Sequence, residues 1–307
     1  MRNNSRGSPS AVANVLQVEQ TTLIPFTAAL NAAGAEWNSC SSEGLAEDLL
    51  RRIAPVQYDR PVTRGKTEPL FITCEDANGE TIEVVAKFSA GCEQGNVNLA
   101  REVIGACLAG DLGLPLPEPF LIQISPDWAA TVPIPKIARS SPVAFGSAVV
   151  TRQWGVWAPG NVITEPMLQT AAAIFVFDGI IQNPDRRSSN PNCFVRGDDL
   201  RIFDHELAFS HEMIIAWVAP WRVGGLKSLE TEGNHIFRMG LRSRAIDYDA
   251  IRRAWTGLSD GQIADYEGAL PAEWPDVASA AASAIRLIRS ARDNIDGVLD
   301  EVKRVLS

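Results

Sequence analysis

The residues of this chain that could do chemistry gather around one short polar segment, NPDRRSSN at 183–190. Apolar runs lie on both sides of it, AAAIFVFDGII before and LRIFDHELAF after. Asp185 precedes Asn190 by five positions, and Asp204 lies in the second apolar run. A loop with a carboxylate and a carboxamide, followed by a second carboxylate, can deprotonate a hydroxyl and hold Mg²⁺ against phosphates. The pattern therefore indicates phosphoryl transfer, and its alternative is a polar surface turn, which these residue types also favour.

A lysine and a glutamate in the first half of the chain fit the same chemistry. Lys87 ends the strand-like segment VVAKF among apolar neighbours, and Glu102 lies early in the helical segment that follows. A lysine that a carboxylate holds in place can grip nucleotide phosphates, although a strand-edge lysine with its ammonium in water is an equal alternative. A loop that covers phosphates would lie before the first strand of a hairpin, at Gly65, Lys66 and Thr67.

The composition is that of an ordinary globular protein and excludes several classes of site. A net charge of −9 argues against broad phosphate neutralisation, so no nucleic-acid partner is predicted. The five cysteines contain no CxxC pair and the three histidines lack zinc-site spacing. Lys66 and Thr67 do not complete a P-loop, because Arg60 stands where its first glycine is required. With no apolar run long enough to span a bilayer and no targeting segment, we expect a cytoplasmic protein.

Hydrophobic patterning predicts strands in the first half of the chain and helices after about residue 156. The predicted strands are a hairpin over 69–90 with a turn at 76–79, and segments 114–124 and 147–154, with a loop over 133–146. The predicted helices are 22–34, 44–53, 98–113, 165–181, 247–258, 261–270 and 278–306. A turn at 196–199 predicts a further hairpin ahead of Asp204. Runs of strands followed by runs of helices are typical of an α+β protein.

Four segments taken together resemble the HipA-like kinase family, in particular its stand-alone members with a minimal N-lobe. They are VVAKF, NLAREVIGACLAGDLGLPLPEP, FDGIIQNPDRRSSNPN and IFDHELAF, and the resemblance covers roughly residues 55–300. The segment from FDGIIQNPDRRSSN to IFDHELAF is also similar to the catalytic core of type II phosphatidylinositol 4-kinases. Residues 1–50 have no counterpart in this resemblance.

The resemblance implies a two-lobed, protein-kinase-like fold that binds ATP and Mg²⁺ between its lobes. Residues 1–50 would be an N-terminal extension, 51–155 a small β-rich N-lobe and 156–307 a larger helical C-lobe. By the same resemblance Asp185 is the catalytic base, Asn190 and Asp204 are the Mg²⁺ ligands, and Lys87 grips phosphates with Glu102 as its partner. The backbone that would meet adenine is Val149, Val150, Thr151 and Arg152.

The phosphate acceptor implied by the resemblance is a hydroxyl of Ser or Thr in an unidentified protein. A small molecule or an inositol lipid is the alternative acceptor, and a non-catalytic binding module on a kinase-like fold is the alternative function. His205 and Glu206 follow Asp204 where protein kinases have Phe-Gly, so the activation-loop logic of protein kinases is not expected here. His205 fits a structural or a catalytic role equally, and His235 is expected at the start of a helix.

Overall fold

The structure is a computed structural model that describes residues 49–63, 65–150 and 153–307. All of them belong to one compact unit, Ser42–Ser307. The predicted helix over 22–34 and the first half of the one over 44–53 lie outside the described residues. Within the described part, the fold is mixed α+β as predicted, with strands concentrated before residue 156 and helices after it.

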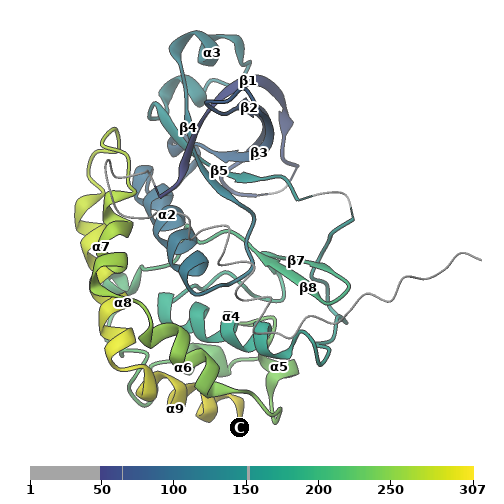
Figure 1. Ribbon diagram of the computed structural model, residues 1–307, viewed down its shortest axis with the longest axis vertical. Helices are drawn as coiled ribbons and strands as arrows, with labels where there is room; N and C mark the ends of the chain where they lie inside the picture. Colours follow the sequence, from purple (N-terminus) through teal and green to yellow (C-terminus); the bar gives the residue numbers. More distant parts are fainter. Residues whose placement is uncertain (1–48, 64, 151–152) are drawn as a thin grey trace, which may run out of the picture. The chain divides into compact units, whose positions relative to one another are not determined.

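Five strands form a closed barrel in the order β1-β2-β3-β5-β4 (Figure 1). Their bounds are β1 Arg51–Pro61, β2 Leu70–Glu75, β3 Thr81–Lys87, β4 Pro119–Gln123 and β5 Val143–Ala148. The predicted hairpin is confirmed as β2 and β3, and its turn is stabilised by Asp76, whose Oδ1 accepts the amides of Asn78 and Glu80 at 2.8 and 3.0 Å. Alternate residues of β2 point into the barrel, where Leu70, Ile72 and Cys74 are fully buried.

Two predictions about the barrel are wrong, and in both cases strand pairing decides the outcome. Residues 51–53 were expected to end a helix, but they pair in parallel with 120–122 of β4 and Ile53 enters the barrel core. The strand expected at 147–154 is instead β5, which begins in the predicted loop and ends at Ala148. A Cβ on Gly146 would lie 2.6 Å from Ile122 Cδ1, so glycine at this position allows β5 to pack closely against β4.

The second half contains helices and one small sheet. The helices are α4 Leu168–Ile181, α5 Arg238–Leu241, α6 Tyr248–Thr256, α7 Asp260–Gly268, α8 Ala278–Asp293 and α9 Ile295–Leu306. The sheet contains β6 Gly155–Val156, β7 Cys193–Arg196 and β8 Asp199–Ile202, so the hairpin predicted at 196–199 is confirmed. The single helix expected over 278–306 is two helices, which separate at Asn294, where the backbone leaves helical geometry (φ −118°, ψ 28°).

Helix α2, Asn96–Asp111, follows β3 after a short 3₁₀ helix, Ser89–Gly91, and contacts β5, α7 and α8. Nearly every residue from Asn98 to Ala109 is buried, which fits a helix packed on several sides. The hydroxyl of Tyr266 in α7 donates to Asp111 Oδ2 at 2.7 Å at the far end of α2. Before β5, a short helix α3 spans Pro126–Thr131 and is capped by Ser125, whose Oγ accepts the amide of Trp128.

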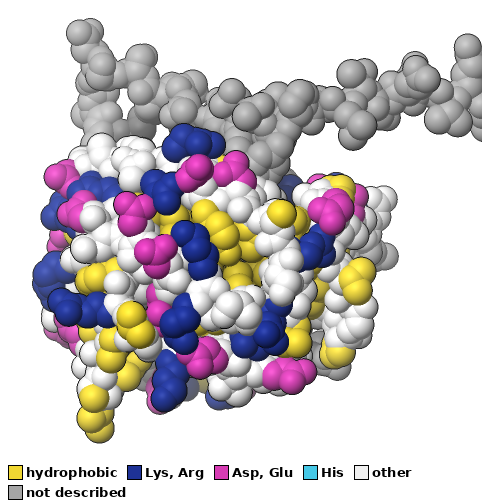
Figure 2. Space-filling model, turned by 90° about the horizontal axis from the view of Figure 1, so that it is seen from below, with side chains coloured by type: hydrophobic (Ala, Val, Ile, Leu, Met, Phe, Trp, Pro, Cys, Tyr) yellow, Lys and Arg dark blue, Asp and Glu magenta, His cyan; other side chains and the backbone are white. Residues whose placement is uncertain are grey.

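The surface carries charges of both signs in close alternation. Figure 2 shows Lys and Arg side chains interspersed with Asp and Glu side chains on one face of the molecule. On α6 and α9, for example, Arg252 Nε pairs with Asp296 at 2.6 Å and Lys303 with Asp300 at 3.0 Å. In the part of the chain that the structure describes, no helix combines the length and apolarity that crossing a membrane requires.

Candidate active site

The polar segment at 183–190 forms a loop that begins where α4 ends. Gln182 closes the helix in the left-handed region (φ 54°), and the Asn183 amide then donates to the Asp178 carbonyl at 3.0 Å. Asp185 accepts the side-chain amide of Asn190 at 2.7 Å and that of Asn192 at 3.2 Å. The loop therefore brings the predicted base and the predicted ligand together, and the Asn190 carboxamide keeps its oxygen for another partner because its nitrogen makes this bond.

Arg186, a residue of this loop, turns its side chain inward and is completely buried. Its Nε donates to Asp178 Oδ2 at 2.5 Å, and its Nη1 donates to the carbonyls of Asn192 and Phe203. One guanidinium thus ties α4, the end of the loop, and the residue before Asp204. A planar group with five donors is suited to satisfy so many acceptors at once.

Two histidines complete this buried network. His235 Nε2 lies 3.0 Å from Asp178 Oδ2, and His205 Nε2 lies 3.3 Å from Arg186 Nη2. Burial lowers the pKa of His205 to about 3, with Arg186 adding to the effect, and burial also lowers the pKa of His235 although Asp178 opposes it. Burial alone would raise the pKa of Asp178, but Arg186 and His235 hold it well below its usual range. His235 precedes α5 without starting it, so its predicted place is corrected to a hydrogen-bonding position in the core.

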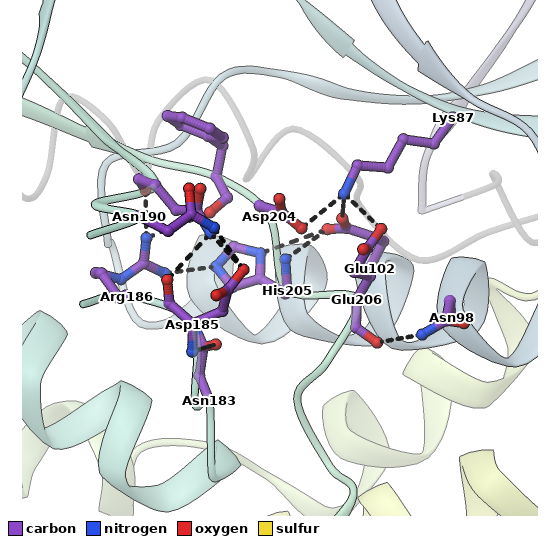
Figure 3. A network of polar contacts seen from close by, with 12 residues as sticks. Lys87, Asn98, Glu102, Asn183, Asp185, Arg186, Asn190, Asp204, His205 and Glu206 are labelled. Atoms are coloured by element: carbon purple, nitrogen blue, oxygen red, sulfur yellow. Dashed lines mark hydrogen bonds and ion pairs between the residues drawn. The ribbon is translucent and has the colours of Figure 1, made fainter. Parts of the chain in front are cut away.

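Lys87 points into a group of three carboxylates (Figure 3). Its Nζ lies 2.5 Å from Glu102 Oε1, 2.7 Å from Asp204 Oδ1 and 2.9 Å from Glu206 Oε2. The structure therefore brings Lys87 and Glu102 together with Asp204, which lies 117 positions after Lys87 in the sequence. Glu206, which sequence reasoning passed over, joins them as a fourth member.

The charges in this cluster do not balance, because one ammonium faces three carboxyl groups. Although burial disfavours its charged form, the carboxylates of Asp204, Glu102 and Glu206 raise the pKa of Lys87 well above its usual value. Burial raises the pKa of Glu102 to about 7 against the pull of Lys87, whereas Lys87 outweighs burial at Asp204 and lowers its pKa. One oxygen each from Glu102, Asp204 and Glu206 lies within 4.8 Å of the others. Such a set of hard oxygen donors with excess negative charge fits a divalent cation such as Mg²⁺.

Helix α2 holds the turn that carries Asp204. The His205 amide donates to Glu102 Oε2 at 2.9 Å, and Asn98 Nδ2 donates to the Glu206 carbonyl at 2.8 Å. Asp204 itself lies in the left-handed region (φ 66°), which Asp tolerates better than most residues. The helix approaches so closely that a Cβ on Gly105 would lie 2.8 Å from His205 Cβ. Glycine at this position is therefore required for the contact between α2 and the turn.

The remaining predicted site residues lie around the barrel. Gly65 (φ 123°), the exposed Lys66 and the buried Thr67 lie between β1 and β2. Val149 and Val150 follow the end of β5, and the Val149 amide donates to the Glu83 carbonyl at 2.9 Å. Thr151 and Arg152 lie outside the described residues. A pocket beside the carboxylate cluster is lined in part by Phe145 and Ser147 of β5 and by Phe203.

Sequence reasoning missed several residues that organise the site. Asp178 was visible as a lone acid in the apolar run AAAIFVFDGII, which is the pattern of a buried charge that needs a partner. Glu206 had no such signal, because an acid near a loop is usually solvated. Asn192 supports Asp185 only because the chain turns back at this residue in the left-handed region (φ 44°).

Comparison with known proteins places this arrangement in a family. A family model described as HipA-like kinase matches residues 56–221, which is more than half of the chain and includes the barrel except for the start of β1, together with α2, α4 and the loop with Asp185. A search among curated proteins finds no match. With the family model covering the segments that build the site, the chain belongs to the HipA-like kinase family.

Proposed function

We propose that this protein is an ATP- and Mg²⁺-dependent kinase that transfers the γ-phosphate to a hydroxyl group, with Ser or Thr of a protein as the acceptor. The observation that carries the proposal is the convergence of Lys87 on Glu102 and Asp204, at 2.5 and 2.7 Å. A lysine on a strand, paired with a helix glutamate and adjoining an aspartate after a hairpin, is the arrangement that grips nucleotide phosphates in kinases.

In the proposed fold, residues 51–155 and 156–307 act as two lobes and ATP lies between them. Lys87 would bind the phosphates, and Glu102 would hold Lys87 in place. Asp185, which Asn190 and Asn192 orient, would accept the proton of the attacking hydroxyl. As the new bond between the acceptor oxygen and the γ-phosphorus forms, the bond to the β-γ bridging oxygen breaks and ADP leaves.

Asp204 and Asn190 are the residues we propose to hold Mg²⁺, and Glu206 is placed to join them. The surplus of carboxylates around Lys87 supports Asp204 and Glu206 in this role, since a single ammonium leaves the cluster with net negative charge. A bound Mg²⁺ would supply neutralisation of the charge on the phosphate oxygens. Without Mg²⁺, the Lys87 ammonium would reduce the repulsion between the carboxylates of Asp204 and Glu206.

The first test measures the melting temperature with and without ATP, each with and without Mg²⁺. ATP at a hundredfold excess over its Kd stabilises the folded state by about 2.7 kcal/mol, which corresponds to roughly 5–10 °C for a chain of this size. We expect this shift to require Mg²⁺ and to disappear in Asp204→Ala. Asp199→Ala is the matched control, because Asp199 forms only an exposed pair with Arg196. No shift up to millimolar ATP would refute phosphoryl transfer.

The second test follows the labelled γ-phosphate with protein, small-molecule and inositol-lipid acceptors offered separately. Asp185→Ala should abolish transfer to every acceptor while leaving the ATP-dependent melting shift in place, because Asp185 is assigned to the hydroxyl and not to ATP. If the label appears only on a lipid or a small molecule, that molecule and not a protein is the acceptor. If the wild type binds ATP but transfers no phosphate, the protein is a non-catalytic binding module.

A further inference from the structure

The segment between α3 and β5, residues 136–141, lies against three parts of the proposed phosphate site. It contains a short 3₁₀ helix, Ile137–Arg139, and Ile137 anchors it in the barrel core. Lys136 is buried, with only 8% of its side chain exposed. A lysine is rarely buried unless its ammonium is fully paired, so its partners show what it is for.

Among the described residues, the hydrogen-bond partners of the Lys136 ammonium belong to the loop between β1 and β2. Its Nζ donates to the Thr67 carbonyl at 3.0 Å, to the Glu68 carbonyl, and to Glu68 Oε2 at 3.2 Å. Two of these acceptors are backbone groups, so the contact depends on where the loop runs more than on its side chains. The loop needs such support, because Glu68 has a left-handed backbone (φ 46°) that is unfavourable for this residue type.

The serines of the same segment hold the chain that follows Lys87. Ser140 Oγ accepts the Ala90 amide at 3.2 Å, and the Ser141 amide donates to Ser89 Oγ at 2.8 Å. The Ser141 hydroxyl also donates to Oδ1 of Asn96, the first residue of α2, at 2.8 Å. The segment therefore reaches the turn after Lys87 and the start of the helix that carries Glu102.

The turn after β3 also packs directly against the loop between β1 and β2, at Gly91. A Cβ on Gly91 would lie 2.4 Å from the Thr67 carbonyl oxygen and 3.4 Å from Lys136 Nζ. Gly91 thus lets the turn after β3 pack directly against the loop. Enlarging Gly91 and removing the Lys136 ammonium are two independent ways to displace the same backbone.

We infer that residues 136–141 are a clamp that holds the β1–β2 loop over the phosphates of a nucleoside triphosphate, and that Lys136 is its positioning residue. This inference rests on the proposed function, because it takes the phosphates to lie between this loop and Lys87. Lys136 acts through the loop and is not assigned a contact with ATP. The clamp lowers the cost of ordering the loop when the nucleotide binds.

The test compares Lys136→Met with the wild type by hydrogen exchange and by nucleotide affinity. Without nucleotide, the amides of Val62 and Glu68, which donate to Pro69 and Gly65 carbonyls, should exchange faster in the variant. The Kd for ATP should rise about tenfold, whereas the Kd for adenosine, which has no phosphates, should stay the same. In turnover, the KM for ATP should rise with kcat nearly unchanged, as for loss of uniform binding.

Three further variants keep the test decisive if Lys136→Met folds poorly. Lys136→Arg retains several donors and should recover most of the ATP affinity, and Gly91→Ala should reproduce the Lys136→Met pattern. Glu75→Gln should resemble the wild type, because Glu75 is exposed at the end of β2 that lies away from the loop. Equal weakening of ATP and adenosine, or unchanged exchange at 62–69 with intact ATP binding, would overturn the clamp. A wild type that binds no ATP would instead refute the proposed function, and exchange would still show whether the clamp holds the loop.

Discussion

The buried pair of Asp178 and Arg186 should be the most sensitive polar contact beneath the active-site loop. Asp178→Asn removes one charge and leaves the other in place. The Asp178 carboxylate accepts hydrogen bonds from Asn183 at 2.9 Å and from Arg186 at 2.5 and 3.2 Å, and it lies 3.0 Å from His235 Nε2. Neither charged side chain of the pair has any exposed surface. Asn at position 178 cannot neutralise Arg186. Its NH₂ group would also face a hydrogen-bond donor where a carboxylate oxygen of Asp178 now accepts.

The expected cost follows from that burial. Breaking a buried ion pair by removing one partner costs about 3–5 kcal/mol, because the remaining charge is buried without compensation. At roughly 2–4 °C per kcal/mol for a domain of this size, the melting temperature should fall by roughly 6–20 °C. Since the pKa of Asp178 is held below its usual value, its contribution is complete near neutral pH. That contribution is lost as the pH falls from about 4, where the unfolded carboxyl titrates, through the folded pKa.

Urea unfolding at pH 7.5 measures the loss in the free energy of unfolding, and a substitution at the protein surface is the matched control. Asp199→Asn removes an exposed partner of Arg196 and should cost about 0–1 kcal/mol. The double variant Asp178→Asn with Arg186→Met should be more stable than Asp178→Asn alone, because it removes the stranded charge. The reasoning is refuted if Asp178→Asn costs no more than Asp199→Asn, or if the double variant is no more stable than the single one.

Two other features give contrasting expectations. Gly105→Ala should destabilise the protein by about 1–3 kcal/mol and reduce phosphoryl transfer, because its Cβ would lie 2.8 Å from His205. Gly110→Ala is in the same helix, with nothing within 4 Å of the new Cβ, and should stabilise the protein by about 0.5–1 kcal/mol. Equal melting temperatures for the two variants would contradict the close approach of Gly105 to His205. Burial lowers the pKa of His235, so below about pH 6.5 the unfolded state binds more protons at this residue than the folded state does. The wild type should therefore lose stability on acidification, by up to about 1.4 kcal/mol per pH unit from this group. His235→Gln should lose less between pH 7.5 and 5.5 in urea titrations, and an unchanged loss would show that His235 is not buried in the neutral form.

Local patterns in the sequence were enough for the parts of the site that lie within one segment. The five-residue spacing of Asp185 and Asn190 predicted a shared loop, and the structure joins their side chains at 2.7 Å. The apolar setting of Lys87 and the helix that follows it predicted a partner in Glu102, which is 2.5 Å away. The catalytic and metal roles of these residues, and the lobe boundaries, remain predictions that the proposed experiments test.

Features that depend on contacts between distant segments were beyond the reach of these patterns. Glu206 looks like a solvated acid until the turn after β8 brings it to Lys87, 119 positions earlier in the chain. Lys136 lies in a Pro- and Ser-rich stretch that is typical of a loop, and only the barrel shows that its ammonium meets Thr67. The strand β5 was misplaced for the same reason, since its pairing with β3 and β4 outweighs its turn-forming residues.

The sequence by itself determined the α+β class, the hairpin at β2 and β3, the long buried α4 and the resemblance to HipA-like kinases. The first three depend on residues close together in the chain, where hydrophobic periodicity and turn residues act directly, and the resemblance depends on four short segments taken together. Only the tertiary structure decided which strands close the barrel, that Arg186 is a buried support and that three carboxyl groups surround one lysine. Those outcomes depend on burial and on contacts between separate segments, such as the pairing of Lys87 with Asp204 and Glu206, 117 and 119 positions later in the chain. The energy of such contacts exists only once the chain has folded.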